Sequence, residues 1–165
     1  MKKIDNDGLL LCEIQAKAFE LSGDVQDTSS EVFIRRFMNS EAAKQMDNLT
    51  VLQSNMQATD LIDLIEEEYG KSEYGSVKYS SNELYWIGYI YRYYAYTYDK
   101  TSKQVYKSVK PKELRGLFLP YHTMDPAQAI DRILEAKGLA DDDIDEEKRQ
   151  FKIYKRIREE SSVIC

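Results

Sequence analysis

Residues 80–98 read SSNELYWIGYIYRYYAYTY, and this segment constrains the fold of the chain more than its neighbours do. Ser80 and Glu83 have the spacing of a capping box, in which the serine accepts a bond from a backbone amide and the glutamate reaches back. The residues after the box are apolar or aromatic almost all round, which is typical of a central helix covered on several sides. A strand is the alternative, because tyrosine favours sheets and tyrosines alternate at residues 89, 91 and 93. The length and the cap favour a helix from Leu84 to Tyr98.

The rest of the chain carries further helical patterns and start signals. We therefore expect an all-α protein, a compact helical bundle of about seven helices, in which residues 71–79 form a loop. Thr28 with Glu31 resembles a second capping box, and Thr59 resembles a third helix start. The expected helical segments are Leu9–Leu21 (ended by Gly23), 30–38, a short one from Ser40, 59–69, 84–98, 101–109, 111–119 (ended before Pro120), 126–138 and 144–160.

The length of 165 residues fits one domain with at most a tail. We expect a helical core domain over residues 1–138 and a charged C-terminal helix over residues 139–165, docked on the core or projecting from it. The chain lacks an apolar run of the roughly 18–20 residues that cross a bilayer, and its start turns acidic too soon for a signal peptide. With only two cysteines, a disulfide framework is not expected. These features predict a cytoplasmic protein that does not contact a membrane.

The sequence argues against an enzyme. It contains neither a glycine-rich phosphate loop nor a nucleophile elbow, and it has a single histidine, His122. Two carboxylate runs, 66–68 and 141–143, lack the alternating ligands and central glycine of a calcium loop, so we interpret them as solvated surfaces. We therefore expect no catalytic residue, no metal site and no cofactor.

The charges are unevenly distributed. The chain has a net charge of −6, yet residues 91–123 hold seven basic and two acidic side chains. Residues 101–119 also have the lengths of a short helix-turn-helix-like pair, whose second helix would meet base edges in a major groove. The candidate nucleic-acid-binding residues are Lys103, Lys107, Lys110, Lys112 and Arg115. Two solvated amphipathic helices would show the same pattern, so a DNA-binding regulator is one alternative.

Seven of the fourteen residues from Tyr85 to Tyr98 are tyrosine. Burying all of them would require a partner for every hydroxyl, because an unpaired buried hydroxyl costs roughly 1–3 kcal/mol. Tyrosine is also favoured at protein interfaces, where one end of its ring is wet. We therefore expect several of these side chains at a protein-binding surface, and the candidate partner-binding residues are Tyr85, Tyr89, Arg92, Tyr93 and Tyr96.

Arg115 and His122 are separated by six residues, a spacing similar to the arginine–histidine motif of HEPN-type ribonucleases. The resemblance implies phosphate stabilisation by the arginine and proton transfer by the histidine. It covers only these two residues, and Pro120 between them should break the helix that carries both. A divergent HEPN-like ribonuclease is thus the second alternative.

Four blocks, at residues 29–38, 82–92, 110–115 and 120–123, are similar to a group of small uncharacterised bacterial proteins that accompany toxins of the ADP-ribosyltransferase type. The similarity spans most of residues 8–136. It implies an antitoxin-like role, the neutralisation of a protein partner, and it carries no catalytic residue over. The preferred prediction is a non-enzymatic binding protein whose partner is a toxin, with possible additional contact to operator DNA.

Overall fold

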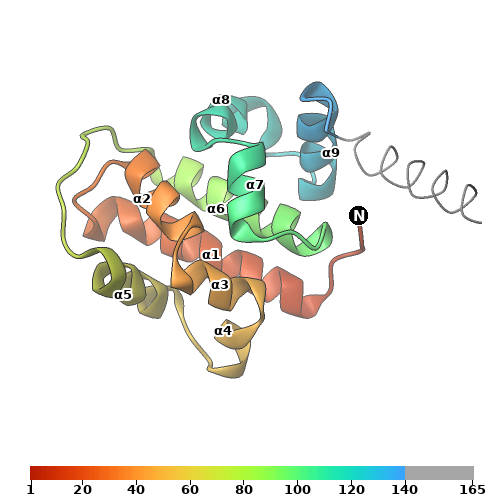
Figure 1. Cartoon of the computed structure of the whole chain (residues 1–165). Coiled ribbons are helices and arrows are strands. Elements are labelled where there is room, and N and C mark those ends of the chain that lie inside the picture. Colours follow the sequence, from red (N-terminus) through yellow and green to blue (C-terminus); the bar gives the residue numbers. More distant parts are fainter. Residues whose placement is uncertain (140–165) are drawn as a thin grey trace, which may run out of the picture. The chain divides into compact units, whose positions relative to one another are not determined.

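Helix α6, Ser81–Thr97, packs along α1, Asn6–Val25, and this pair lies at the centre of the fold (Figure 1). The two helices run antiparallel, because the backbone amide of Lys2 donates to the carbonyl of Thr97 at one end while Gly23 approaches Leu84 at the other. Midway along the pair, a Cβ on Gly88 would lie 3.0 Å from the Cα of Ala16. Glycine is therefore required at residue 88 for the two backbones to approach this closely.

The computed structural model describes residues 1–139, which form nine α-helices and no β-strand. The prediction of an all-α fold is confirmed, and the strand alternative for residues 84–98 is wrong. The other helices are α2 Ser30–Met38, α3 Glu41–Asp47, α4 Thr50–Gln53, α5 Ala58–Tyr69, α7 Ser102–Ser108, α8 Pro111–Tyr121 and α9 Pro126–Ala136. The predicted helix 144–160, and all but one residue of the predicted C-terminal region 139–165, lie outside the described residues.

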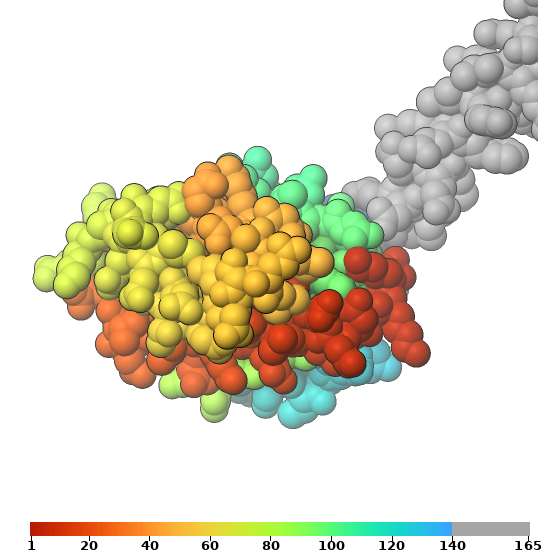
Figure 2. Space-filling model, turned by 90° about the horizontal axis from the view of Figure 1, so that it is seen from below, coloured from red at the N-terminus to blue at the C-terminus, as the bar shows by residue number. Residues whose placement is uncertain are grey.

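The smaller helices cover the central pair on different sides. Helices α2 and α5 pack on α1, whereas α7 and α8 pack on α6 (Figure 1). On the face shown in Figure 2, α3, α4 and α5 lie beside the N-terminal residues of the chain. The core contains the phenylalanines of α1 and α2: the Phe19 ring meets those of Phe33 and Phe37 edge-on, at centroid distances of 5.6 and 5.1 Å.

The chain divides into two units, Met1–Pro126 and a second that begins at Ala127, so the predicted boundary after residue 138 falls within the second unit. In the second unit, α9 buries the apolar positions of one face, Ala129, Ile130, Ile133 and Leu134. No helix within residues 1–139 combines the length and apolarity that a membrane span requires.

Several predicted helix ends need correction. The N-cap of α2 is Ser29, whose hydroxyl accepts from the Val32 amide, and not Thr28. Thr28 is buried instead, and its hydroxyl is the one buried side-chain polar atom of residues 1–139 without a hydrogen-bond partner. Helix α5 starts one residue before Thr59, with Gln57 as its cap. The Ser80–Glu83 capping box of α6 is confirmed.

Two predicted helix stops are also wrong. Helix α1 continues through Gly23 to Val25, because burial of its apolar face outweighs the roughly 1 kcal/mol cost of a helical glycine. Helix α8 includes Pro120 in its last turn. A proline removes only one backbone donor, and at a helix end little of the ladder follows it.

A buried arginine joins four helices of the first unit. The guanidinium of Arg92 on α6 donates to Gln15 of α1 (2.9 Å), Asp47 of α3 (2.6 Å) and Ser102 of α7 (2.5 Å). The side chain of Gln15 in turn donates to the carbonyl of Gly88, at 3.0 Å. Arg92 is 1% exposed, so its bonds to Gln15 and Ser102 are shielded from water, whereas the side chain of Asp47 is 17% exposed. The network therefore fixes α1, α3 and α7 relative to α6.

Candidate functional site

The structure separates the tyrosines of α6 into two groups by what their hydroxyls do. The hydroxyl of Tyr91 donates to the carbonyl of Val109 at 2.5 Å, and that of Tyr96 donates to Asp5 at 2.6 Å. In contrast, the hydroxyls of Tyr85 and Tyr89 have no hydrogen-bond partner within residues 1–139, and both residues are half-buried. The hydroxyls of Tyr91 and Tyr96 thus contribute to the fold, whereas those of Tyr85 and Tyr89 have no partner among the described residues.

Tyr85, Tyr89 and Tyr93 form a ladder along α6. Successive ring centroids are 6.4 and 6.3 Å apart, and the rings are inclined by only 23° and 28°. A helix places residues four apart on one face, one above the other, so the ladder follows directly from the spacing of the tyrosines. Tyr93 is 8% exposed, and the accessible part of the ladder is therefore formed by Tyr85 and Tyr89.

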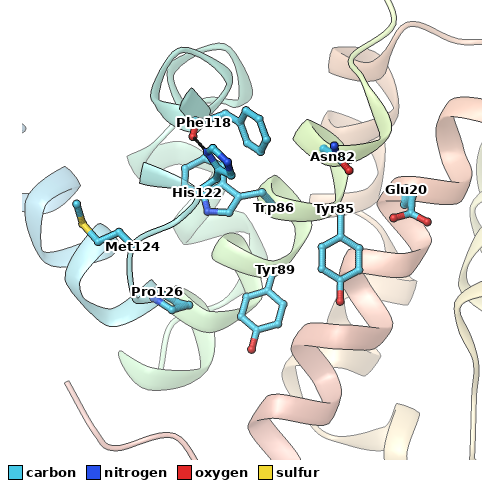
Figure 3. Close-up of a pocket in the computed structure, with 9 residues that line it drawn as sticks. All are labelled: Glu20, Asn82, Tyr85, Trp86, Tyr89, Phe118, His122, Met124 and Pro126. Carbon is cyan, nitrogen blue, oxygen red and sulfur yellow. Dashed lines mark hydrogen bonds between the residues drawn. The ribbon is translucent and has the colours of Figure 1, made fainter. Parts of the chain in front are cut away.

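The ladder borders an open groove of about 640 Å³ (Figure 3). Trp86 and Phe118 meet edge-on in it, with ring centroids 6.0 Å apart, and the ring of His122 stacks on that of Phe118 at 4.3 Å. The side chains that line the groove come from α1, α6, α8, the segment after α8 and the first residue of α9: Glu20, Asn82, Tyr85, Trp86, Tyr89, Phe118, His122, Met124 and Pro126. The volume lies within the range of pockets that hold a small ligand or a side chain of a partner.

The single histidine is held by the main chain of its own helix. Its Nδ1 lies 2.7 Å from the carbonyl oxygen of Phe118 and 3.2 Å from that of Leu119. Both of these atoms accept hydrogen bonds, so Nδ1 carries a proton and donates. In the neutral imidazole, Nε2 is then the nitrogen that accepts, and His122 contributes an acceptor to the groove.

Burial and nearby carboxylates raise the pKa values of the tyrosines of the groove. Burial raises the pKa of the Tyr85 hydroxyl, and the negative charges of Glu13 and Glu20 on α1 raise it further. Burial, with a smaller contribution from Glu13, raises the pKa of Tyr89 to about 12. Both phenols are therefore neutral at physiological pH. Lys17 lies on α1 between the two glutamates but forms no ion pair with either of them.

Three of the five candidate partner-binding residues do not line this groove: the buried Tyr93, together with Arg92 and Tyr96. Arg92 is buried and bonded to three side chains, which corrects the expectation that it contacts a partner. Tyr96 borders a different hollow, of about 340 Å³, beside Lys2 and Asp99. Its hydroxyl donates to the Asp5 carboxylate, and this bond, followed by burial, raises the pKa of Tyr96 to about 12. The structure thus brings Tyr85, Tyr89 and Tyr93 together and separates Arg92 and Tyr96 from them.

The candidate nucleic-acid-binding residues lie on or between α7 and α8, which are joined by residues 109–110. Lys103, Lys107 and Lys112 are exposed and have no ion-pair partner in the described part of the chain. The ammonium of Lys110 lies over the Tyr106 ring at 4.3 Å. Three lysines are therefore accessible on this helix pair.

Arg115 is engaged by its neighbours. Its Nε donates to Glu83 at 3.1 Å, and its guanidinium lies over the Tyr79 ring at 4.3 Å. Glu83 also completes the capping box of α6, so Arg115 ties α8 to the start of the central helix. Arg115 is not among the residues that line the groove, whereas His122 is. The two members of the HEPN-like spacing are thus held by different contacts.

Other potential reactive centres are buried or dispersed. Cys12 is fully buried on α1, and burial raises the pKa of its thiol to about 12, which suppresses the reactive thiolate. Within residues 1–139, His, Cys, Asp and Glu side chains do not gather into a group that could hold a metal ion.

No family model, curated protein or solved structure matches the chain. Its function must therefore be argued from the groove. The sequence analysis did not identify Glu20, Trp86 and Phe118 as parts of one site. They lie on three helices, and local sequence patterns do not predict how these helices pack. The i, i+4 spacing of Tyr85 and Tyr89 is a signal that could have placed these two side chains on one face of the helix.

Proposed function

We propose that this chain is a non-enzymatic binding protein, an antitoxin-like partner that covers the active surface of a toxin with its aromatic groove. The observation that carries the proposal is the pair Tyr85 and Tyr89, whose rings stack and whose hydroxyls have no partner within residues 1–139. Tyrosines with an apolar body and a wet hydroxyl are the side chains that most often anchor a protein interface.

The charge around the groove favours a protein over a nucleic acid. Glu20 lines the groove, and the charge of Glu13 acts on both half-buried tyrosines, Tyr85 and Tyr89. These carboxylates would repel a phosphate backbone, although aromatic side chains could otherwise stack on bases. A partner with basic side chains would instead be attracted.

The antitoxin-like role rests on the sequence resemblance described above and on this groove. Inhibitors of this kind act by occupying a surface, so they need an interface but no catalytic group. A standard protein interface buries about 800 Å² on each partner, more than the groove alone. The groove would therefore hold the central anchor, and surrounding helices would form the rim.

Co-expression with the product of the adjacent gene tests the proposal. We expect the two proteins to co-purify and the chain to restore the growth of cells that express the partner. Tyr85→Ala with Tyr89→Ala should weaken the complex at least about 100-fold, because central anchors each contribute roughly 2 kcal/mol or more. Tyr74→Ala is the matched control: Tyr74 is 73% exposed in the loop between α5 and α6, so its removal should leave binding unchanged. Failure to form a complex, or a complex that tolerates the double variant, would refute the proposal.

The accessible lysines of α7 and α8 support a second candidate function, contact with operator DNA. Replacing Lys103, Lys107 and Lys112 with alanine should lower affinity for any duplex and reduce the slope of log affinity against log salt by about three. An affinity that ignores salt would contradict DNA binding. RNA cleavage through Arg115 and His122 stays a prediction, and loss of cleavage in His122→Ala would be its test.

A further inference from the structure

We infer that the groove selects an arginine side chain of the partner protein, which would stack on the Tyr85–Tyr89 ladder and donate to Glu20. The inference rests on the proposed function, because it names the chemistry that the same groove would recognise.

Two hydrogen-bonding side chains of the groove act as acceptors, and one can only donate. The carboxylate of Glu20 can only accept at neutral pH, and Nε2 of His122 is left as an acceptor once Nδ1 donates to the main chain. Tyrosine and asparagine side chains can act either way. The neutral indole of Trp86 is the one lining side chain that can only donate, and neither lysine nor arginine lines the groove. An occupant rich in donors would therefore be best satisfied.

The charge of the groove also favours a positively charged occupant. Glu20 is its only carboxylate, and Glu13 adds a second negative charge within reach of the Tyr85 and Tyr89 hydroxyls. Lys17 lies between these two glutamates on α1, so the three side chains together carry a net charge of −1. An anionic occupant would face this charge without a cation of the groove to compensate it.

The shape of the aromatic wall distinguishes a guanidinium from an ammonium. The rings of Tyr85 and Tyr89 are 23° from parallel, with centroids 6.4 Å apart, and both project from α6 between Glu20 and His122 (Figure 3). A planar guanidinium can lie on such a ring and still direct its donors outward, whereas an ammonium is a compact, strongly hydrated point charge. The same stacking occurs within this chain, where the guanidinium of Arg115 lies 4.3 Å from the centre of the Tyr79 ring and its Nε donates to Glu83.

Trp86 makes the inference directly measurable. It is the only tryptophan of the chain and it lines the groove, so its indole N–H gives one side-chain signal in a proton–nitrogen correlation spectrum. The probes are N-acetyl-arginine amide, N-acetyl-lysine amide and N-acetyl-glutamate amide, titrated into the full chain. We expect the arginine probe to shift the indole signal saturably with a Kd on the order of millimolar. The lysine probe should bind several-fold more weakly, and the glutamate probe should not saturate.

Variants separate the two parts of the contact. Glu20→Gln should weaken the arginine probe about 3- to 10-fold through loss of the charge, and Tyr89→Ala should weaken it by a similar factor through loss of the stacking surface. Glu67→Gln, an identical change at an exposed position on α5, is the control and should leave the affinity unchanged. Folding of each variant is checked by the dispersion of the backbone signals.

Four results would overturn the inference: no saturable shift with the arginine probe up to about 50 mM, equal affinity for the lysine or glutamate probe, an unchanged affinity in Glu20→Gln, or displacement of the arginine probe by a short single-stranded oligonucleotide. These failures differ from failure of the proposed function. A partner complex that depends on Tyr85 and Tyr89 but not on Glu20 would overturn the arginine and keep the binding role. If the groove binds the arginine probe but no protein complex forms, the arginine preference of the groove is kept and the proposed binding role is overturned.

Discussion

Replacing Arg92 with methionine removes a buried charge and three hydrogen bonds while keeping most of the side-chain volume. In the native protein the guanidinium is bonded to Gln15, Asp47 and Ser102 at distances between 2.5 and 2.9 Å. The arginine is 1% exposed and its bonds to Gln15 and Ser102 are buried, so water does not readily replace these two bonds when the side chain is lost. The variant therefore measures how much this network contributes to the fold.

The expected cost follows from the partners left behind. Three hydrogen bonds to a charged group contribute roughly 1.5–3 kcal/mol each, and loss of the guanidinium also removes its own desolvation penalty. Asp47 keeps the amide and the hydroxyl of Ser102 as donors, at 3.1 and 2.7 Å, and its side chain is 17% exposed. The Oε1 atom of Gln15 loses its donor. We therefore expect a loss of about 3 kcal/mol, at the lower end of the range for breaking a buried pair.

Urea unfolding followed by far-ultraviolet circular dichroism measures this loss. Glu41→Gln is the control, because it breaks the exposed pair between Glu41 and Lys44 and should cost less than about 0.5 kcal/mol. A loss of under about 1 kcal/mol for Arg92→Met would refute the reasoning. If that variant does not fold, Ser102→Ala removes one hydroxyl of the network and should cost about 1–2 kcal/mol.

Three further predictions concern packing, pH and an unpaired hydroxyl. Gly88→Ala should destabilise the protein by about 1–3 kcal/mol, because the new Cβ would lie 2.9 Å from a ring carbon of Phe19 on α1. Gly116→Ala in α8 should stabilise the protein by about 0.5–1 kcal/mol, because its new Cβ would meet nothing within 4 Å. The denaturant midpoint should therefore fall in the first variant and rise in the second. The hydrogen bond from Tyr96, followed by one from a backbone amide, lowers the pKa of Asp5 below its ordinary 3.8. This carboxylate therefore contributes stability that is full above its unfolded-state pKa and is lost as the pH falls through the lower folded value. Melting temperatures measured from neutral to acidic pH should show that step in the native protein, and Asp5→Asn should lack it. Thr28→Val should leave the stability unchanged or raise it by up to about 1 kcal/mol, because the buried hydroxyl that it removes has no partner within residues 1–139. A clear loss of stability in thermal unfolding would contradict this expectation.

Local patterns predicted the helices well where a cap and a long apolar run agree. The box formed by Ser80 and Glu83, with the aromatic run after it, was sufficient for α6. The ends of the helices were less predictable, because they depend on contacts with residues that are distant in the sequence. Thr28 and Ser29 are equally good caps by residue type, and backbone bonds from Ser29 to Tyr74 and from Ser30 to Val77 position the start of α2.

The site was predictable only as a list of tyrosines. Their spacing indicated which of them share a helix face, but not which face is covered by other helices. Arg92 was predicted to be a partner-binding residue, and arginine is indeed frequent at binding surfaces. Its burial depends on Gln15, Asp47 and Ser102, which are separated from it by up to 77 positions. The local sequence around Arg92 does not predict such distant partners.

The arginine network also bears on how the protein is made. Its members are at positions 15, 47, 92 and 102, so a growing chain cannot complete the network until residue 102 has left the ribosome. Before α6 emerges, α1 lacks its main packing partner, and before residue 102 emerges the Arg92 guanidinium lacks one of its acceptors. The first unit should thus fold late and in one step during synthesis, and fragments that end before α7 should be captured by chaperones rather than accumulate as native-like pieces.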